Sequence, residues 1–284
     1  LISMNIIAPF DIDNISSFKD KKCCIIKGKH NFIENIINNA CQYKWADIEY
    51  QYFLALIDAR NSSKKESEVV SLNDIFSTIK NSFIEYLNSL DYNSHNSSLS
   101  NIFYHLLDNK NNSDQIIFLN FNYTNSLLKY YEDYKNDSSI REVSIHGKLS
   151  DSSSIIFGYG DESSAEYYDL EKENDNKFLD NFKSFHYIKS NSYRELFKSL
   201  KENKPWTVHI IGHSCGLCDK ILLKEIFDND DCESIHIYPY KRKDGTLDLV
   251  EKIQQISRHF SSNTKHNLRT KISYNPKYLI ESNE

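Results

Sequence analysis

The chain has 284 residues, of which 39% are hydrophobic and 13% aromatic, so it carries enough apolar material for a large core and is not a disordered chain. Its net charge is -6 without a long single-sign block, which argues against nucleic acid as a partner. Apolar runs stay well short of the roughly 20 residues that a membrane helix needs, and the N-terminus lacks a signal-like segment. We therefore expect a cytoplasmic protein without a membrane partner.

The N-terminal part of the sequence predicts helices. Apolar residues recur at helical spacing after Trp45, and again from Leu72 to Leu90, while a shorter helix is expected from Ser100 to Leu107. Stretches rich in Ser and Asn separate these segments and favour turns. We expect residues 1–110 to form a helical cap that continues into the core.

From residue 115 onward, short apolar runs alternate with helical patterns, as in a parallel sheet covered on both faces. This pattern predicts an α/β core over residues 111–284. The expected strands are Gln115–Leu119, Glu142–Ile145, Ser154–Phe157, Thr207–Ile211 and Ser234–Tyr238. The expected helices are Asn125–Tyr134, Lys177–Ile188, Tyr193–Lys201, Leu217–Phe227 and Leu247–Phe260.

Polar residues and glycines gather where the predicted strands end. Five of the seven glycines fall within the four segments 119–124, 145–148, 157–161 and 211–219. In an open α/β sheet, the carboxyl ends of the strands share one edge, where ligands bind and where glycine lets the backbone approach them. We expect the functional site at this edge.

The segment from Gly212 to Asp219 admits two further interpretations. Gly212-x-Ser214-x-Gly216 after an apolar strand matches the nucleophile elbow of serine hydrolases, with His146-Gly147 imitating an oxyanion loop. The remaining triad members would be Asp244 or Asp248 with His259 or His266. Cys215 and Cys218 also form a C-x-x-C pair at a strand-to-helix junction, where redox chemistry is conceivable. The spacing of the His, Cys and Asp residues predicts no metal site, and the six cysteines are expected to be reduced.

An ordered set of motifs resembles the AbiH family of bacterial phage-defence proteins. The set consists of Trp45-Ala46-Asp47-Ile48-Glu49, Asn120-Phe121-Asn122-Tyr123-Thr124, His146-Gly147, Ile156-Phe157-Gly158, Gly212-His213-Ser214 with Asp219, and Tyr238-Pro239-Tyr240 before the last long helix. AbiH proteins are similar to the sirtuin-like group, so the resemblance implies a Rossmann-like nucleotide-binding core. It also implies abortive infection as the biological role, with NAD or a related nucleotide as the ligand.

The resemblance further implies roles for individual residues. Asn122 and His146 become the catalytic candidates, because an amide can orient ribose or water and an imidazole can accept a proton near neutral pH. The expected ligand-binding residues are Asn120, Tyr123, Thr124, Gly147, Gly158, Gly212, His213, Ser214 and Asp219. A phage-derived trigger and a homo-oligomer are further implied partners.

The sequence departs from the family pattern in its N-terminal segment and at one position of the site. No glycine precedes residue 28, so Asn5 to Asp11 is at best a degenerate form of the glycine loop that would hold phosphates. The first residue is Leu1, which predicts that an upstream segment is missing. Thr124 stands where many sirtuin-like enzymes carry an acid. Two main hypotheses follow: an enzyme that hydrolyses NAD, and a module that binds a nucleotide or phage component without turnover.

Overall fold

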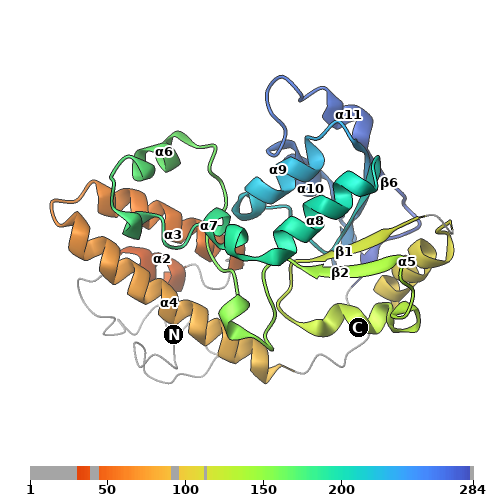
Figure 1. Cartoon of the computed structure of the whole chain (residues 1–284), viewed down its shortest axis with the longest axis horizontal. Helices are drawn as coiled ribbons and strands as arrows, with labels where there is room; N and C mark the ends of the chain where they lie inside the picture. Colours follow the sequence, from red (N-terminus) through yellow and green to blue (C-terminus); the bar gives the residue numbers. More distant parts are fainter. Residues whose placement is uncertain (1–30, 39–44, 91–95, 112–113, 282–284) are drawn as a thin grey trace. The chain divides into compact units, whose positions relative to one another are not determined.

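A computed structural model describes residues 31–38, 45–90, 96–111 and 114–281 (Figure 1). The expected N-terminal remnant at Asn5 to Asp11 and the cysteines at 23, 24 and 41 lie outside this range. The described residues divide into two compact units. The first unit combines the chain up to residue 90 with residues 157–183, and the second combines residues 91–156 with residues 184–284.

The first unit is helical, as the periodicity predicts. Its elements are α2 (Asn31–Asn38), α3 (Trp45–Arg60), α4 (Lys65–Ser89), α6 (Ala165–Glu171) and the 3₁₀ helix η5 (Asn176–Phe178). Stacked aromatic rings fill its interior, with ring centroids 3.9 Å apart for Tyr52 and Phe76 and 4.2 Å apart for Phe53 and Tyr159. Because Tyr159 belongs to the returning segment 157–183, this segment packs with the N-terminal helices.

The second unit is mixed α/β and contains small parallel sheets. Its strands are β1 (Ile116–Asn120), β2 (Ile140–Ser144), β3 (Trp206–Ile211), β4 (Cys232–Tyr238), β5 (Tyr240–Lys241), β6 (Ile272–Tyr274) and β7 (Ile280–Glu281). They pair in parallel as β1-β2, β3-β4-β6 and β5-β7. Its α-helices are α5 (Ser97–Asp108), α8 (Asn191–Glu202), α9 (Lys220–Phe227), α10 (Leu249–Ser257) and α11 (Asn267–Lys271), and α7 (Lys183–Lys189) begins at its boundary.

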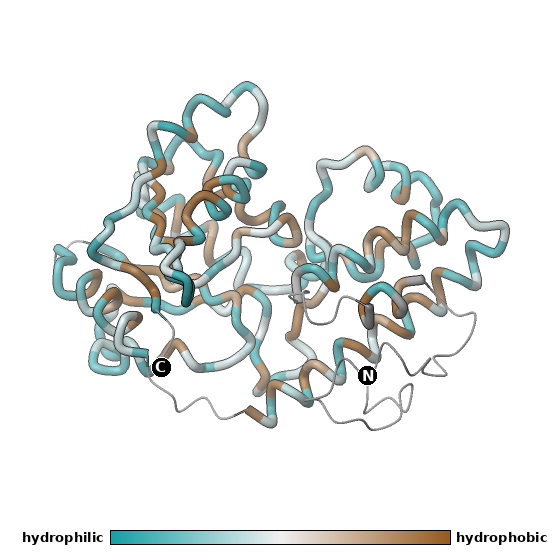
Figure 2. The backbone as a smooth tube through the Cα atoms, turned by 180° about the vertical axis from the view of Figure 1, so that it is seen from behind, coloured by the Kyte–Doolittle hydropathy of each residue, from teal (hydrophilic) through white to brown (hydrophobic). Residues whose placement is uncertain are grey.

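One hydrophobic core joins β1 and β2 to the three-stranded sheet and to the helices of the second unit. It includes Val143 from β2, Ile210 from β3 and Ile237 from β4, with Leu196 from α8 and Leu222 from α9. Figure 2 shows apolar and hydrophilic segments alternating along the backbone, including along the helical coils. This core fixes the ends of β1, β2 and β3, from which the candidate site is built.

The opposite face of the β3-β4-β6 sheet is polar in its middle, whereas Ile211 and Tyr238 at the strand ends pack on this face in a second hydrophobic cluster with Ile102 of α5. The aligned pairs Thr207 with Ser234 and His209 with His236 lie on this face, together with Ser273, which pairs with His236. The rings of His209 and His236 stack with centroids 4.9 Å apart, and the Ser273 hydroxyl lies 2.6 Å from Nδ1 of His236. The strands therefore alternate between apolar and polar side chains.

Three sequence predictions of local structure require correction. The apolar run Ser154–Phe157 is not a strand, because it follows the 3₁₀ helix η4 (Ser152–Ser154) and its Ile156 amide donates to the carbonyl of His146. The expected helix Asn125–Tyr134 consists of two 3₁₀ helices, η2 (Asn125–Tyr130) and η3 (Glu132–Tyr134). The expected helix Lys177–Ile188 is interrupted between η5 and α7. Apolar residues led to all three predictions, since a short apolar pattern does not distinguish a strand or α-helix from an irregular segment.

Candidate functional site

The candidate site lies in the second unit, in the loops that follow β2 and β3. His146 comes two residues after the end of β2, and His213 comes two residues after the end of β3. Asp219 ends the short 3₁₀ helix η6 (Leu217–Asp219), directly before α9. The fold thus brings together three of the residues that the sequence assigns to the site.

The carboxylate of Asp219 lies between the two imidazoles. Its Oδ1 is 3.1 Å from Nε2 of His146, and its Oδ2 is 3.4 Å from Nε2 of His213. The side chains are 6% exposed for His146, 10% for Asp219 and 21% for His213. The group therefore extends from a buried imidazole to one that is partly open to solvent.

Two aromatic residues complete this cluster, and the sequence gives no indication of either role. The Tyr187 hydroxyl from α7 lies 3.0 Å from Nε2 of His146. The Phe121 ring follows β1 and contacts both imidazoles, with centroids 5.3 Å from His146 and 4.0 Å from His213. A buried carboxylate beside aromatic walls interacts strongly with any nearby positive charge, since little water screens it.

The turn after β3 is held in an unusual backbone conformation. Gly212 has φ 72° and Cys215 has φ 55°, both in the left-handed region. The Cys215 amide donates to Nδ1 of His213 at 3.0 Å, and the Lys252 ammonium donates to the His213 carbonyl at 2.8 Å. These two bonds fix His213 in place, because they hold both its ring and its backbone.

Asp219 changes the acid–base behaviour of His213. Burial lowers the pKa of His213, but its hydrogen bonds and charge interactions with Asp219 and Cys215 together outweigh burial and raise the pKa to about 9. The amide of Cys215 occupies Nδ1 in the neutral form, so taking up a second proton there would break that bond. Protonation of His213 is thus linked to the conformation of the turn.

The residues after β1 have mainly structural contacts. Asn120 is buried, its Nδ2 donates to Glu142 Oε1 at 2.9 Å, and its Oδ1 accepts from the Asn122 amide at 2.9 Å. The Tyr123 hydroxyl donates to the Ile156 carbonyl at 3.0 Å, and Thr124 is buried with its hydroxyl 2.9 Å from that of Ser126. The side chain of Asn122 is exposed at the tip of this turn.

The glycines and Ser214 differ in their surroundings. Gly147 has φ 86° and packs directly against the backbone of Ser154. Gly212 and Ser214 are exposed in the turn after β3. Gly158 belongs to the first unit, where its amide donates to Oε1 of Glu49 at 2.9 Å. The structure therefore gathers Gly147, Gly212 and Ser214 in the unit that holds His146, and assigns Gly158 to the other unit.

Glu49 belongs to the Trp45-to-Glu49 motif, to which the sequence assigns no chemistry. Its Oε2 lies 3.1 Å from the ammonium of Lys183, and both side chains are almost fully buried. Lys183 also donates its amide to the Tyr159 carbonyl. This motif therefore supplies a buried ion pair that holds the returning segment within the first unit.

The groups that a serine hydrolase would need are bound to other partners. Nε2 of His259 donates to the Cys215 carbonyl at 2.9 Å, and Asp248 pairs with Lys252 at 3.2 Å. Asp244 accepts from Thr246, and His266 contacts the carbonyl of Asn263. The thiols of Cys215 and Cys218 are buried and form no disulfide. Among the described residues, no group of three or more His, Cys, Asp or Glu side chains is arranged to hold a metal ion.

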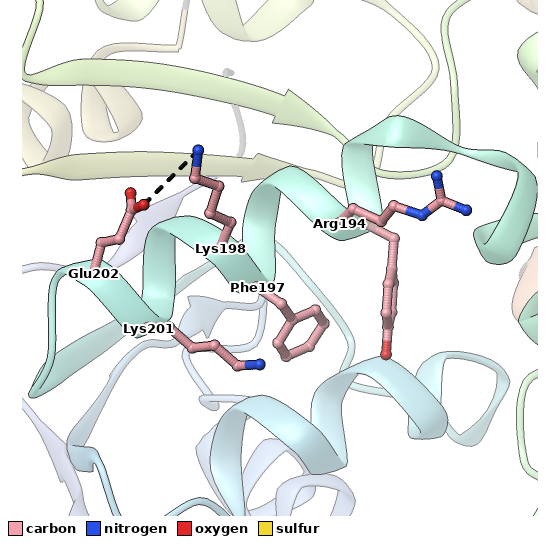
Figure 3. A pocket seen from close by; sticks show the side chains of 6 residues that line it. Arg194, Phe197, Lys198, Lys201 and Glu202 are labelled. Carbon is pink, nitrogen blue, oxygen red and sulfur yellow. Dashed lines mark ion pairs between the residues drawn. The ribbon is translucent and has the colours of Figure 1, made fainter.

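A separate groove runs along α8 and has a volume of about 540 Å³. It is lined by Tyr193, Arg194, Phe197, Lys198, Lys201 and Glu202, and Figure 3 shows that all of these side chains project from the one helix. The Tyr193 ring stacks on Tyr187 at 5.3 Å, and Tyr187 is the partner of His146. The groove shares no lining residue with the cluster of His146, Asp219 and His213.

The fold and site together define a class: a mixed α/β protein with small parallel sheets, whose strand-end loops carry a buried carboxylate between two imidazoles. A family model described as "Bacteriophage abortive infection AbiH" matches residues 16–240. Since this match covers most of the sequence, the chain belongs to the AbiH family, and the family indicates a role in abortive infection by bacteriophage. No curated protein and no solved structure matches the chain.

Membrane association through a spanning helix finds no support in the structure. Within the part of the chain that the structure describes, every helix is too short or too polar to cross a bilayer. This agrees with the hydropathy of the sequence.

Proposed function

We propose that this AbiH protein acts in phage defence as a nucleotide hydrolase, with NAD as the first candidate substrate and His146 as the reacting base. The observation that carries the proposal is the buried contact of 3.1 Å between His146 and Asp219 at the ends of parallel strands. A carboxylate beside an imidazole stabilises the imidazolium that forms when the ring accepts a proton. The resemblance of the motifs to sirtuin-like proteins supports a nucleotide as the ligand.

The proposed reaction needs a base and groups that position the substrate. Water would add to the ribose carbon that carries nicotinamide, while the carbon–nitrogen bond breaks and its electron pair leaves with nicotinamide. The proton lost by water would pass to His146, and the products would be ADP-ribose, nicotinamide and a proton. Asn122, whose exposed side chain follows Phe121 in the turn after β1, would orient the ribose or the water, and Ser214 would bind a hydroxyl or phosphate.

A direct test measures NAD and nicotinamide in bacteria that express the chain and are infected with phage. NAD is expected to fall in cells with the natural sequence, and His146→Ala and Asn122→Ala are each expected to slow its loss by at least about 100-fold, as for removal of an acid–base or positioning group. His105→Ala and Asn263→Ala are matched controls, because these residues lie on α5 and on an exposed loop, outside the loops that follow β2 and β3. Constant NAD during infection would refute the proposed substrate.

A second candidate function is nucleotide binding without turnover, and the burial of His146 favours it. The ring is only 6% exposed, and its Nε2 already contacts both Asp219 and Tyr187. These contacts are also what a structural histidine would make. Calorimetry on the purified chain decides between the two functions: heat of NAD binding without release of nicotinamide, together with phage protection that survives His146→Ala, would support the binding function.

A further inference from the structure

The carboxylate of Asp219 is shared between two imidazoles. His146 and His213 each direct Nε2 toward a different oxygen of Asp219, at 3.1 and 3.4 Å. Since a carboxylate carries one negative charge, it can fully compensate one imidazolium but not two. The Phe121 ring contacts both imidazoles and keeps this region poor in water, so charges within it interact strongly.

We infer that Asp219 is the positioning residue of the site and that His213 competes with His146 for its carboxylate, so that protonation of one imidazole opposes protonation of the other. This inference deepens the proposed function and rests on its assignment of His146 as the base. Asp219 would hold the ring of His146 with the proton on Nε2. His213, which is the more exposed of the two, would set how much of the negative charge remains for His146.

The tautomers of the two rings are consistent with this sharing. An ionised carboxylate only accepts hydrogen bonds, so each Nε2 that faces it must carry a proton. For His213 the Cys215 amide independently indicates the same tautomer, because it donates to Nδ1. Both rings thus direct an Nε2 proton to Asp219, and either becomes charged by gaining a second proton on Nδ1. Because the pKa of His213 is raised to about 9, His213 gains that proton first as the pH falls and takes up the charge of Asp219.

Other titratable groups surround the pair, and each has its own partner or burial. They are Tyr123 from the turn after β1, Tyr187 from α7, Cys215 from the turn after β3, Lys220 from α9, Lys252 with Asp248 at α10, and His259 after α10. Lys252 is neutralised by Asp248 at 3.2 Å. Burial lowers the pKa of His259 to about 4, so this ring stays neutral above pH 5. Changes in titration near neutral pH should therefore come from the pair that shares Asp219.

The inference is tested by NMR titration of the full chain with ¹⁵N-labelled histidine, using His146→Gln to identify the signal of His146. Asp219→Asn should move the titration midpoint of His146 down by about one pH unit, because the compensating charge is lost. His213→Asn should move it up by a similar amount, because Asp219 then serves one imidazole. Asn is chosen because its side-chain oxygen can still accept from the Cys215 amide.

A second variant guards against a local rearrangement of the turn. His213→Gln can keep a donor toward Asp219 but cannot take up a proton, so the midpoint of His146 should still rise, by less than in His213→Asn. Shifts in opposite directions for the Asp219 and His213 variants support the inference. A midpoint that is unchanged or lowered in both His213 variants overturns it.

This measurement needs no substrate, so its failure can be told apart from failure of the proposed hydrolysis. If NAD is not consumed but the midpoint of His146 shifts in opposite directions in the Asp219 and His213 variants, the inference about the shared carboxylate is supported and the proposed reaction is refuted. Where activity is present, the acid limb of its pH profile should move in the same direction as the midpoint of His146 in each variant. A merely structural Asp219 would change stability without moving that limb.

Discussion

Gly147, directly after His146, combines a left-handed backbone with a contact that leaves no room for a side chain. Its φ is 86°, and an added Cβ would lie 2.2 Å from the carbonyl oxygen of Ser154. Gly245 has a similar φ of 83°, but an added Cβ there would meet no atom within 4 Å. The two glycines therefore separate the cost of backbone strain from the cost of steric overlap.

We expect Gly147→Ala to lower the free energy of unfolding by at least about 2 kcal/mol more than Gly245→Ala does, because only the first adds a clash to the strain that both share. Urea unfolding of both variants under one buffer condition measures the difference. Equal losses would mean that the backbone at Gly147 moves away from Ser154 without cost.

Only some residues of the site can be predicted from the sequence alone. His146 and the turn from Gly212 to Asp219 can be predicted, because they follow apolar runs that form β2 and β3. The role of Asp219 cannot be predicted in the same way, since an acid in the first turn of a helix is also favoured by the helix dipole. Its contact with His146 joins positions 73 residues apart, and only the fold of the second unit brings them within 3.1 Å.

At the scale of elements, a buried ion pair joins α3 to the returning segment of the first unit. Glu49 accepts from the Gly158 amide through one oxygen and contacts Lys183 through the other, at 2.9 and 3.1 Å. Both oxygens of this carboxylate are thus used, as the burial of a charge requires. Removal of one partner would leave the other charge buried without compensation.

We expect Lys183→Met to cost about 3–5 kcal/mol of stability, and Glu49→Gln to cost a similar amount, because each leaves one uncompensated buried group. The double variant should cost clearly less than the sum of the two single variants, since no unpaired charge remains. Urea unfolding of the four proteins gives this coupling energy. Additive costs would show that the two groups act independently.

The sequence predicts some of the strands correctly and others wrongly. The strands at Thr207–Ile211 and Ser234–Tyr238 are confirmed within two residues, since apolar and polar residues alternate along both. The run Ser154–Phe157 is also largely apolar, but it belongs to none of the strands among the described residues. Its last three residues are buried, and Ile156 forms single hydrogen bonds to His146 and Tyr123 in place of a strand ladder. Hydrophobicity reports burial, whereas a strand also needs a neighbour that the local sequence does not specify.

Across the whole molecule, buried neutral histidines make stability depend on pH. His259 is fully buried, donates through Nε2 to the Cys215 carbonyl, and among the described residues has no hydrogen-bond partner for Nδ1. Its pKa falls from 6.5 to about 4, mainly because burial disfavours the charged ring. Between these two values the unfolded chain binds a proton that the folded chain does not, so stability falls as the pH is lowered.

We expect the lowered pKa of His259 to reduce the free energy of unfolding by about 2 kcal/mol between pH 7 and pH 5, because each pH unit below 6.5 costs about 1.36 kcal/mol. His259→Leu removes this contribution, so the difference between its urea midpoints at pH 7 and pH 5 should be smaller than in the natural sequence. His266→Leu, which changes an exposed histidine, is the control and should retain the natural difference. An unchanged difference in His259→Leu would contradict the assignment.

The polar face of the β3-β4-β6 sheet limits how these strands can align. Because side chains alternate along a strand, a shift of β4 by one position would turn His236 and Ser234 toward the core and place Ile235 and Ile237 among hydroxyls and imidazoles. A sheet that was apolar on both faces would accept such a slip at much lower cost. Misalignment is thus disfavoured along the stretch from Ser234 to Ile237, and the correct pairing preserves the position of the loop that begins where β3 ends.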